Sequence, residues 1–299
     1  MNILLLGANG QVGWELRRAL APLGNVTAYG RAEADLADLE SLRDTVRAVG
    51  ANVIVNAAAY TAVDKAESEP DLALRINAEA VALLADEAAR TDAWLVHYST
   101  DYIFDGKKSG AYAEYDVANP VSVYGATKLK GERAVRAASG RHLIFRTSWV
   151  YAPRGKNFAR TMLALAQTRD ELKVVDDQIG APTSAELIAD VTALALRHVQ
   201  NVESAGGTFH LTASGETSWH AYAQRLIQMA ASRGYALKTT PDKVLPIPTS
   251  AYPTPAKRIA NSRLATDKLR TTFGVTLPSW DAALDRFLEE LPHESPASK

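Results

Sequence analysis

The chain has 299 residues, 47% of them apolar and 22% charged, the balance of a globular protein with one large domain or one large and one small domain. Its 33 Lys and Arg residues nearly balance 34 Asp and Glu residues for a net charge of −1, so neither a nucleic acid nor a membrane is an expected partner. The absence of cysteine excludes disulfides, thiolate metal sites and a cysteine nucleophile, and fits a reducing cytoplasm. The run MNILLLGANG lacks a basic segment and is too short to span a bilayer, so we expect a buried strand rather than a signal peptide.

The first half of the sequence alternates short apolar runs with segments of helical period. The expected strands cover residues 2–6, 26–29, 53–56, 94–98 and 143–146. The expected helices cover residues 11–23, 39–49, 72–90 and 122–138. Because the strands are continuously apolar, both of their faces should be buried, as in a parallel sheet covered by helices. This pattern predicts an α/β protein with a Rossmann-type doubly wound parallel sheet.

The alternation becomes less regular after residue 150. Four prolines predict an irregular segment at 244–256, and the tail after Pro292 is expected to fray. The other expected elements are a loop at 176–183, helices at 185–198, 219–233 and 280–291, and a strand at 208–212. We expect residues 1–150 to form an NAD(P)-binding domain, with later segments returning to its sheet. Residues 151–299 should form mainly a smaller substrate-binding cap over the carboxyl ends of the strands.

A glycine-rich turn, GANGQVG, lies between the first expected strand and the first expected helix. Glycines permit a tight turn and let the backbone approach a pyrophosphate, and the helix N-terminus supplies free N–H groups. Gly7, Gly10 and Gly13 are therefore candidate cofactor-binding residues, although a purely structural turn is the alternative.

The end of the second expected strand bears on the choice between NAD and NADP. An Asp or Glu there binds the ribose 2′-hydroxyl, whereas an Arg accommodates a 2′-phosphate. The strand ends Tyr29-Gly30-Arg31 without a carboxylate, which favours NADPH, although a solvated surface arginine is the alternative. Asp35 and Leu36 follow and are candidates to border the adenine.

Two candidate catalytic side chains are four residues apart in an expected helix. Tyr124 and Lys128 share a helix face, and a nearby ammonium favours the phenolate and lowers the pKa of a tyrosine. Such a tyrosine donates a proton to a carbonyl oxygen as hydride reaches the carbon. This spacing also arises by chance, but Thr100 ends an expected strand where this fold binds its ligands. Its hydroxyl is suited to bond the same carbonyl, although a cap or turn is the alternative for a lone threonine.

Other kinds of active site have no support in the sequence. The six histidines form no pair or cluster with metal-binding spacing, so a zinc site is not expected. His97 lies inside an expected strand and is predicted to be structural. A GxSxG motif is absent, which argues against a hydrolase triad.

The glycine loop, the strand-end threonine and the Tyr-x-x-x-Lys pair together resemble the extended short-chain dehydrogenase/reductase family. Longer runs are similar to one branch of that family, which acts on a dTDP-linked sugar. In order between residues 2 and 264, these runs are GANGQVGWEL, VIVNAAAYTAVDKAESEP, VHYSTDYIFDG, VYGATKLKGE, IFRTSWVYA, NFARTML, DQIGAPTSAEL, PTSAYPTPAKR and NSRL. The resemblance implies that NADPH or NADH reduces the 4-keto group of a nucleotide sugar, dTDP-4-dehydro-L-rhamnose, to dTDP-L-rhamnose for cell-surface polysaccharide.

The resemblance also implies roles for individual residues. The cofactor would contact Gly10, Gln11 and Val12 at its pyrophosphate, Asp35 and Leu36 at its adenine, Ala59, Tyr60 and Thr61 toward the nicotinamide, and Tyr124 and Lys128 beside its ribose. Tyr124 would donate the proton, and Thr100 would assist the carbonyl. Asp101 would lie near the sugar and Trp149 would pack on its ring, although a core tryptophan is the alternative.

The sequence departs from the family pattern at two positions, and the resemblance also implies a metal site. Gly30 stands where the family often has an acidic residue, which favours NADPH, and Ile259 stands where it has a proline. Some members are magnesium-linked homodimers. Glu15, Glu186 and Glu290 are the candidate metal ligands here, although isolated surface carboxylates are usually only solvated.

Two other functions stay open. A nucleotide-sugar epimerase or dehydratase of the same fold would return the hydride and consume no cofactor. A non-catalytic regulatory subunit, resembling the β subunit of methionine adenosyltransferase, would not need the candidate catalytic residues. The presence of Tyr124, Lys128 and Thr100 argues against that second alternative.

Overall fold

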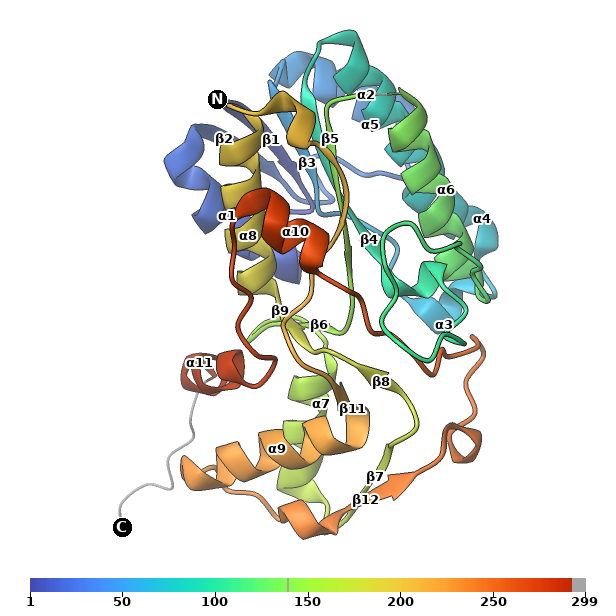
Figure 1. Cartoon of the computed structure of the whole chain (residues 1–299), viewed down its shortest axis with the longest axis vertical. Helices are drawn as coiled ribbons and strands as arrows, with labels where there is room; N and C mark the ends of the chain where they lie inside the picture. Colours follow the sequence, from blue (N-terminus) through green and yellow to red (C-terminus); the bar gives the residue numbers. More distant parts are fainter. Residues whose placement is uncertain (139, 292–299) are drawn as a thin grey trace.

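A computed structural model describes residues 1–138 and 140–291 of the chain. Its centre is a sheet of six parallel strands in the order β10-β5-β4-β3-β1-β2 (Figure 1). These strands are β1 (Asn2–Leu6), β2 (Asn25–Tyr29), β3 (Val53–Asn56), β4 (Trp94–Thr100), β5 (His142–Thr147) and β10 (Gly207–His210). The strand order changes direction between β1 and β3, so the predicted Rossmann-type doubly wound sheet is confirmed. Ligands of such sheets bind beyond the carboxyl ends of the strands at this point.

Helices cover both faces of the sheet (Figure 1). Side chains of β1 alternate, with Ile3 and Leu5 in the core of one face and Leu4 and Leu6 in the core of the other. The first face is covered by α1 (Gln11–Leu20), α8 (Ala185–Val199) and α10 (Asp267–Phe273). The second is covered by α2 (Leu39–Val49), α5 (Ala80–Arg90) and α6 (Val123–Ala138). Because both faces are buried, the strands read as continuous apolar runs.

A smaller lobe follows the carboxyl end of β5 (Figure 1). The chain leaves the sheet through β6 (Val150–Tyr151) and returns through β9 (Thr183–Ser184), which pairs with it and leads into α8. The lobe has its own apolar cores, formed by α7 (Phe158–Thr168), α9 (Trp219–Ser232), α11 (Ala282–Glu290), β7 (Leu172–Val175) and β12 (Val244–Ile247). Two short strands, β8 (Ile179–Gly180) and β11 (Thr217–Ser218), pair antiparallel beside them.

Several local expectations differ from the structure. The proline-rich segment is not wholly irregular, because β12 pairs in parallel with β7 and places Pro246 opposite Val174. A two-stranded edge tolerates proline, since one side of the strand needs no N–H donor. The helix expected at 72–90 is interrupted by a π-helical turn at Arg75–Glu79, and the tail after Pro292 lies outside the described residues. Helices α7 and α10 and strand β7 were not expected at all.

The remaining elements are short. They are the helices α3 (Val63–Ala66) and α4 (Pro70–Leu74), and 3₁₀ turns at Ala21–Leu23, Asp101–Ile103, Glu203–Ala205, Pro241–Lys243 and Thr249–Ala251. Most of them lie in connections at the carboxyl ends of strands or in the smaller lobe, where the irregular backbone surrounds the candidate site.

Candidate active site

The glycine loop between β1 and α1 forms a backbone cradle. Gly7 has a φ of +79°, and a Cβ built on it would lie 2.6 Å from the backbone nitrogen of Ala58. A Cβ on Gly13 would lie 2.0 Å from the Gly7 carbonyl oxygen, so α1 packs closer to the loop than a larger residue would allow. No side chain caps α1 at Gly10, which leaves the first N–H groups of the helix available to an anion. This cradle fits the pyrophosphate of a dinucleotide.

Gln11 connects the glycine loop to the smaller lobe. Its Oε1 accepts a hydrogen bond of 2.8 Å from Nδ2 of Asn157. Asn157 also donates to the Ala152 carbonyl at 2.7 Å and caps α7 by accepting from the Arg160 N–H at 3.0 Å. The run NFARTML, which begins at Asn157, is the only signal for this residue in the sequence.

Arg31 is exposed at the end of β2, but a carboxylate opposes it. Its Nε lies 3.0 Å from Oδ2 of Asp35, and Oε2 of Glu33 accepts a hydrogen bond of 2.9 Å from the Gly30 N–H. The Ala37 N–H and the Arg31 side chain together lower the pKa of Asp35, so Asp35 is ionised. The expectation of a tip without carboxylates is therefore wrong, because the loop turns back on the strand end.

The loop after β3 is held in place by Asn77. Oδ1 of Asn77 accepts from the Tyr60 N–H at 2.9 Å, and Nδ2 donates to the Tyr60 carbonyl at 3.0 Å. The Tyr60 hydroxyl donates to Glu69 at 2.7 Å. Ala59 is half-buried and Thr61 exposed on this loop, while Leu36, the other neighbour expected at the cofactor, is buried in the core.

Thr100, Asp101 and Tyr124 meet at the carboxyl end of β4. Oγ1 of Thr100 donates to Oδ1 of Asp101 at 2.9 Å and accepts from the Tyr102 N–H at 3.2 Å. Burial raises the pKa of Tyr124 above its usual value, against the lowering effect of a hydrogen bond to the Thr100 side chain, and the charge of Asp101 raises it further. Tyr124 is thus a neutral phenol, the form that donates a proton.

Asp101 is a buried carboxyl group at the same place. Only 3% of it is exposed, and burial raises its pKa to about 6, against the hydrogen bonds from Ser262 and Thr100. Such a carboxyl group changes its charge near neutral pH beside the hydroxyl of Thr100. The family resemblance implies that Asp101 lies near the sugar, but a linear sequence does not show its burial.

Nζ of Lys128 hydrogen-bonds the backbone of β4 rather than the side chains of Thr100 and Tyr124. Its Nζ donates to the Tyr98 carbonyl at 2.6 Å and lies 3.4 Å from Nε2 of His97. Burial lowers the pKa of Lys128 to about 8, against the attraction of Glu132. The expectation that Lys128 lowers the pKa of Tyr124 is wrong for this structure, because the pKa of Tyr124 is raised and Lys128 bonds elsewhere.

Trp149 lies where β5 leads into the smaller lobe. It has a φ of +51°, which a bulky residue rarely adopts, and its ring stacks on Trp219 with centroids 3.5 Å apart. Gly180 makes room for it, since a Cβ there would lie 2.7 Å from Cε2 of Trp149. The side chain is half-buried rather than enclosed in a core, so one aromatic pair stands at the edge of the lobe.

Residues 258–264 pack against the site from the far end of the chain. Nη2 of Arg258 lies 2.6 Å from Oδ2 of Asp64, and Nδ2 of Asn261 donates to the carbonyls of Lys108 and Gly110 at 2.7 and 2.8 Å. These bonds fasten the loop after β4 beside Asp101. The runs PAKR and NSRL were the only sequence signal for them, and the sequence cannot show which distant loop they meet.

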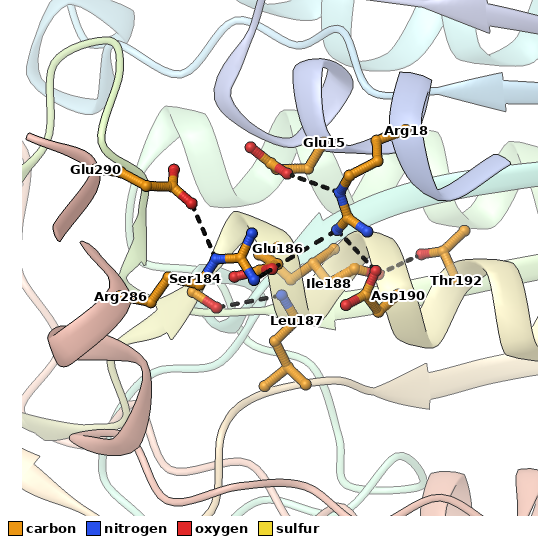
Figure 2. Close-up of polar contacts among 10 residues, drawn as sticks. All are labelled: Glu15, Arg18, Ser184, Glu186, Leu187, Ile188, Asp190, Thr192, Arg286 and Glu290. Atoms are coloured by element: carbon orange, nitrogen blue, oxygen red, sulfur yellow. Dashed lines mark hydrogen bonds and ion pairs between the residues drawn. The ribbon is translucent and has the colours of Figure 1, made fainter. Parts of the chain in front are cut away.

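The three candidate metal ligands lie around one small cavity, but arginines stand among them (Figure 2). Arg286 lies 2.9 Å from both Glu186 and Glu290, and Nε of Arg18 lies 3.5 Å from Oε2 of Glu15. Within residues 1–138 and 140–291, no group of three acidic or histidine side chains is arranged to hold a metal ion. The guanidinium groups neutralise these carboxylates, so the structure does not support the predicted magnesium site.

Comparison with known proteins gives consistent matches over nearly the whole chain. A family model described as RmlD substrate binding domain matches residues 1–292. The chain is 50% identical over 295 residues to a dTDP-4-dehydrorhamnose reductase of Escherichia coli strain K12, covering 97% of this chain and 98% of that protein. It is 36% identical over 289 residues to the spore coat polysaccharide biosynthesis protein SpsK of Bacillus subtilis strain 168, covering 96% and 97%.

Solved structures of similar proteins show the same architecture. A dTDP-4-dehydrorhamnose reductase from Clostridium acetobutylicum superposes with a TM-score of 0.88 at 38% identity, covering 97% of this chain and 99% of that one. The enzyme of the same description from Bacillus anthracis, in complex with NADP, superposes with a TM-score of 0.87 at 33% identity, covering 96% and 98%. Across the described part of the chain, no helix has both the length and the apolar character needed to cross a bilayer.

Proposed function

Because the chain belongs to the family described as RmlD substrate binding domain, we propose that it reduces dTDP-4-dehydro-L-rhamnose to dTDP-L-rhamnose with NAD(P)H. The observation that carries this proposal is the hydrogen bond between the side chains of Tyr124 and Thr100 at the carboxyl end of β4, the same edge of the sheet as the glycine cradle after β1. Related chains described as dTDP-4-dehydrorhamnose reductase, 50% identical over nearly their full length, support the same substrate.

The reaction adds a hydride to the sugar C4 and a proton to its oxygen. The nicotinamide cofactor, when bound, supplies the hydride. Tyr124 donates the proton, for which its raised pKa keeps the phenol protonated, and the Thr100 hydroxyl bonds the same oxygen as charge develops there. Lys128 binds the nicotinamide ribose, and the Tyr98 carbonyl orients its Nζ for this contact.

The cofactor contacts follow the glycine cradle and the strand tips. Gly10, Gln11 and Val12 contact the pyrophosphate on the turn that Gly7 and Gly13 shape. Arg31 and Asp35 border the adenosine beside the buried Leu36, and Ala59, Tyr60 and Thr61 lie toward the nicotinamide. NADPH is preferred because Arg31 is exposed and can turn to a 2′-phosphate. Asp35 competes for that guanidinium, so NADH is also accepted.

The sugar nucleotide lies between the two parts of the chain. Residues 151–299 form mainly the substrate-binding cap, with Trp149 packed on the sugar and Asp101 beside it. A homodimer and a cytoplasmic location stay predictions of the sequence. Light scattering on the purified protein and fractionation of cells test them separately.

The test is a cofactor-oxidation assay with the purified protein and dTDP-4-dehydrorhamnose. We expect one NADPH oxidised for each dTDP-rhamnose formed, identified by mass and by NMR of the product. Conversion of a sugar nucleotide without net NADPH oxidation would instead support an epimerase or dehydratase. No conversion by a folded protein that binds NADPH would contradict the proposal and favour a regulatory subunit.

A further inference from the structure

Lys128 is only 2% exposed, and both polar partners of its Nζ in this structure belong to the protein. Nζ lies 2.6 Å from the Tyr98 carbonyl oxygen and 3.4 Å from Nε2 of His97. On the other side of the imidazole ring, Nδ1 of His97 lies 3.4 Å from Nδ2 of Asn56. His97 and Asn56 are also buried, at 0% and 1% exposure, so bulk water does not reach these atoms. One polar chain therefore runs from α6 through β4 to β3.

The backbone decides the direction of this hydrogen-bond chain. The Ala58 N–H can only donate, and it bonds Oδ1 of Asn56 at 3.1 Å. Nδ2, which also can only donate, is then the amide atom that faces His97. Nδ1 of His97 must accept this bond, so the neutral ring carries its proton on Nε2, the atom that faces Lys128. The reverse amide orientation would place two donors against each other and leave the partly buried Ala58 N–H without its acceptor.

An imidazole N–H that points at Nζ of Lys128 favours the neutral amine over the ammonium. An ammonium group has only donors, so it opposes the Nε2–H, whereas a neutral amine has a lone pair that accepts it. One of the two hydrogens of the neutral amine still donates to the Tyr98 carbonyl. Burial lowers the pKa of His97 well below its usual value, so His97 is neutral whichever form Lys128 takes.

One charged group beside Lys128 favours the ammonium, and two arginines weaken its effect. Glu132, one turn further along α6, favours the ammonium, but Arg146 from β5 lies 2.8 Å from its Oε2 and Arg136 lies 3.0 Å from the same atom. On the β4 side, the Tyr98 hydroxyl bonds Thr192 and not Lys128. On the side of the π-helical turn, Asn77 bonds Thr127 and carries no charge.

We propose that Asn56 and His97 are positioning residues for Lys128. Together they hold the Nε2–H of His97 against Nζ of Lys128 and so favour the neutral amine of the lysine. Their orientation is set by the loop after β3, on the cofactor side of the site. Asn56 ends β3, and the Ala58 N–H that orients it belongs to the loop that continues into Ala59, Tyr60 and Thr61. One hydrogen-bond chain therefore connects that loop to Lys128. The assignment of Lys128 to the cofactor rests on the proposed function, whereas the direction of the chain does not.

The direct test is the tautomer of His97 in the whole protein. Nitrogen-15 NMR of histidine-labelled protein distinguishes the protonated from the unprotonated ring nitrogen, and the spectrum of His97→Gln assigns the signal. We expect a neutral ring with its proton on Nε2 from pH 8 down to pH 5, about 1.5 units below the ordinary histidine value. A proton on Nδ1, or an ordinary titration in this range, would overturn the proposal.

The second test measures where Lys128 loses its proton. Nitrogen-15 shifts of lysine Nζ, assigned with Lys128→Met, are followed against pH in His97→Leu and His97→Gln. Leucine removes the opposing N–H, so the midpoint should rise by about one pH unit, the size of one hydrogen-bond contribution. Glutamine can accept from Asn56 and donate to Lys128 as histidine does, so its midpoint should stay near the original.

A matched control and the opposite outcome complete the test. His210→Gln changes another buried histidine, one that lies near Arg146 rather than Lys128, and should leave the lysine midpoint unchanged. A midpoint that falls in His97→Leu would show that Nε2 accepts from an ammonium, and would reject the proposal. Neither measurement uses the sugar substrate. A lack of reductase activity would therefore reject the proposed function and leave this inference standing.

Discussion

The guanidinium of Arg31 and the carboxylate of Asp35 form an ion pair at the tip of β2, with 3.0 Å between Nε and Oδ2. The Arg31 side chain is 78% exposed and that of Asp35 35% exposed, so the pair is weakly held and opens readily. An NADPH phosphate can therefore take Asp35's place. The ionised carboxylate can equally accept the 2′-hydroxyl of NADH.

Separate substitutions of this pair should move cofactor preference in opposite directions. Arg31→Ala should lower kcat/KM for NADPH by about tenfold, the lower range for a charged hydrogen bond, and change that for NADH little. Asp35→Asn should raise the NADPH to NADH ratio, because Arg31 loses its competitor. Steady-state kinetics with both cofactors measure the ratio, and Arg270→Ala, on α10, is the control. An unchanged ratio in both variants would place the 2′-phosphate elsewhere.

Tyr124→Phe removes the proton donor but keeps the ring. Because general acid catalysis contributes about 10²–10⁴-fold, kcat should fall within that range while the Kd for NADPH stays near its original value. Tyr115→Phe is the matched control, since Tyr115 is 88% exposed. Single-turnover assays and fluorescence titration of NADPH separate the two effects. Near-normal turnover in a folded Tyr124→Phe protein would exclude this residue as the donor.

Gly180→Ala should disturb the sugar site without touching the cofactor. The new Cβ would lie 2.7 Å from Cε2 of Trp149, so the indole must shift on Trp219. We expect the KM for the sugar nucleotide to rise several-fold, as a misplaced anchor of about 1 kcal/mol would cause, with the Kd for NADPH unchanged. Gly110→Ala meets no atom within 4 Å and is the control. An equal loss of NADPH affinity would show that Trp149 faces the cofactor.

His210 should make the protein less stable in acid. Burial, together with the nearby Arg146 charge, lowers the pKa of His210 to about 3 from the ordinary histidine value of 6.5. Its contribution is therefore complete above pH 6.5 and is lost as the pH falls toward 3, because the unfolded state takes up a proton first. Between pH 7 and 5 this amounts to about 2 kcal/mol of unfolding free energy.

Urea denaturation at pH 7 and pH 5 measures this loss. In His210→Gln, the difference between the two pH values should shrink by about that 2 kcal/mol, whatever the stability at pH 7. His220→Gln, at a half-buried histidine of the smaller lobe, serves as comparison. An equal acid loss in His210→Gln would mean that other groups carry it.

Local patterns predicted most of the sheet and the glycine loop. Strands β1 and β3 and helix α2 have the expected bounds, because a strand buried on both faces needs an uninterrupted apolar run and a helix needs its period. The smaller lobe was harder to predict. Its β12 contains Pro246 and is a strand only because β7, about 70 residues earlier, supplies the partner.

The sequence by itself determined the kind of site: a glycine turn before a helix, a hydroxyl at a strand end and a tyrosine four residues before a lysine. Each of these depends on neighbours within a few residues, whose geometry the local backbone sets. Only the tertiary structure decided the charges. Arg18 and Arg286 meet Glu186 from two other helices (Figure 2), and Lys128 bonds β4 instead of Tyr124. Protonation and pairing depend on burial and on contacts between distant segments, which a linear pattern does not contain.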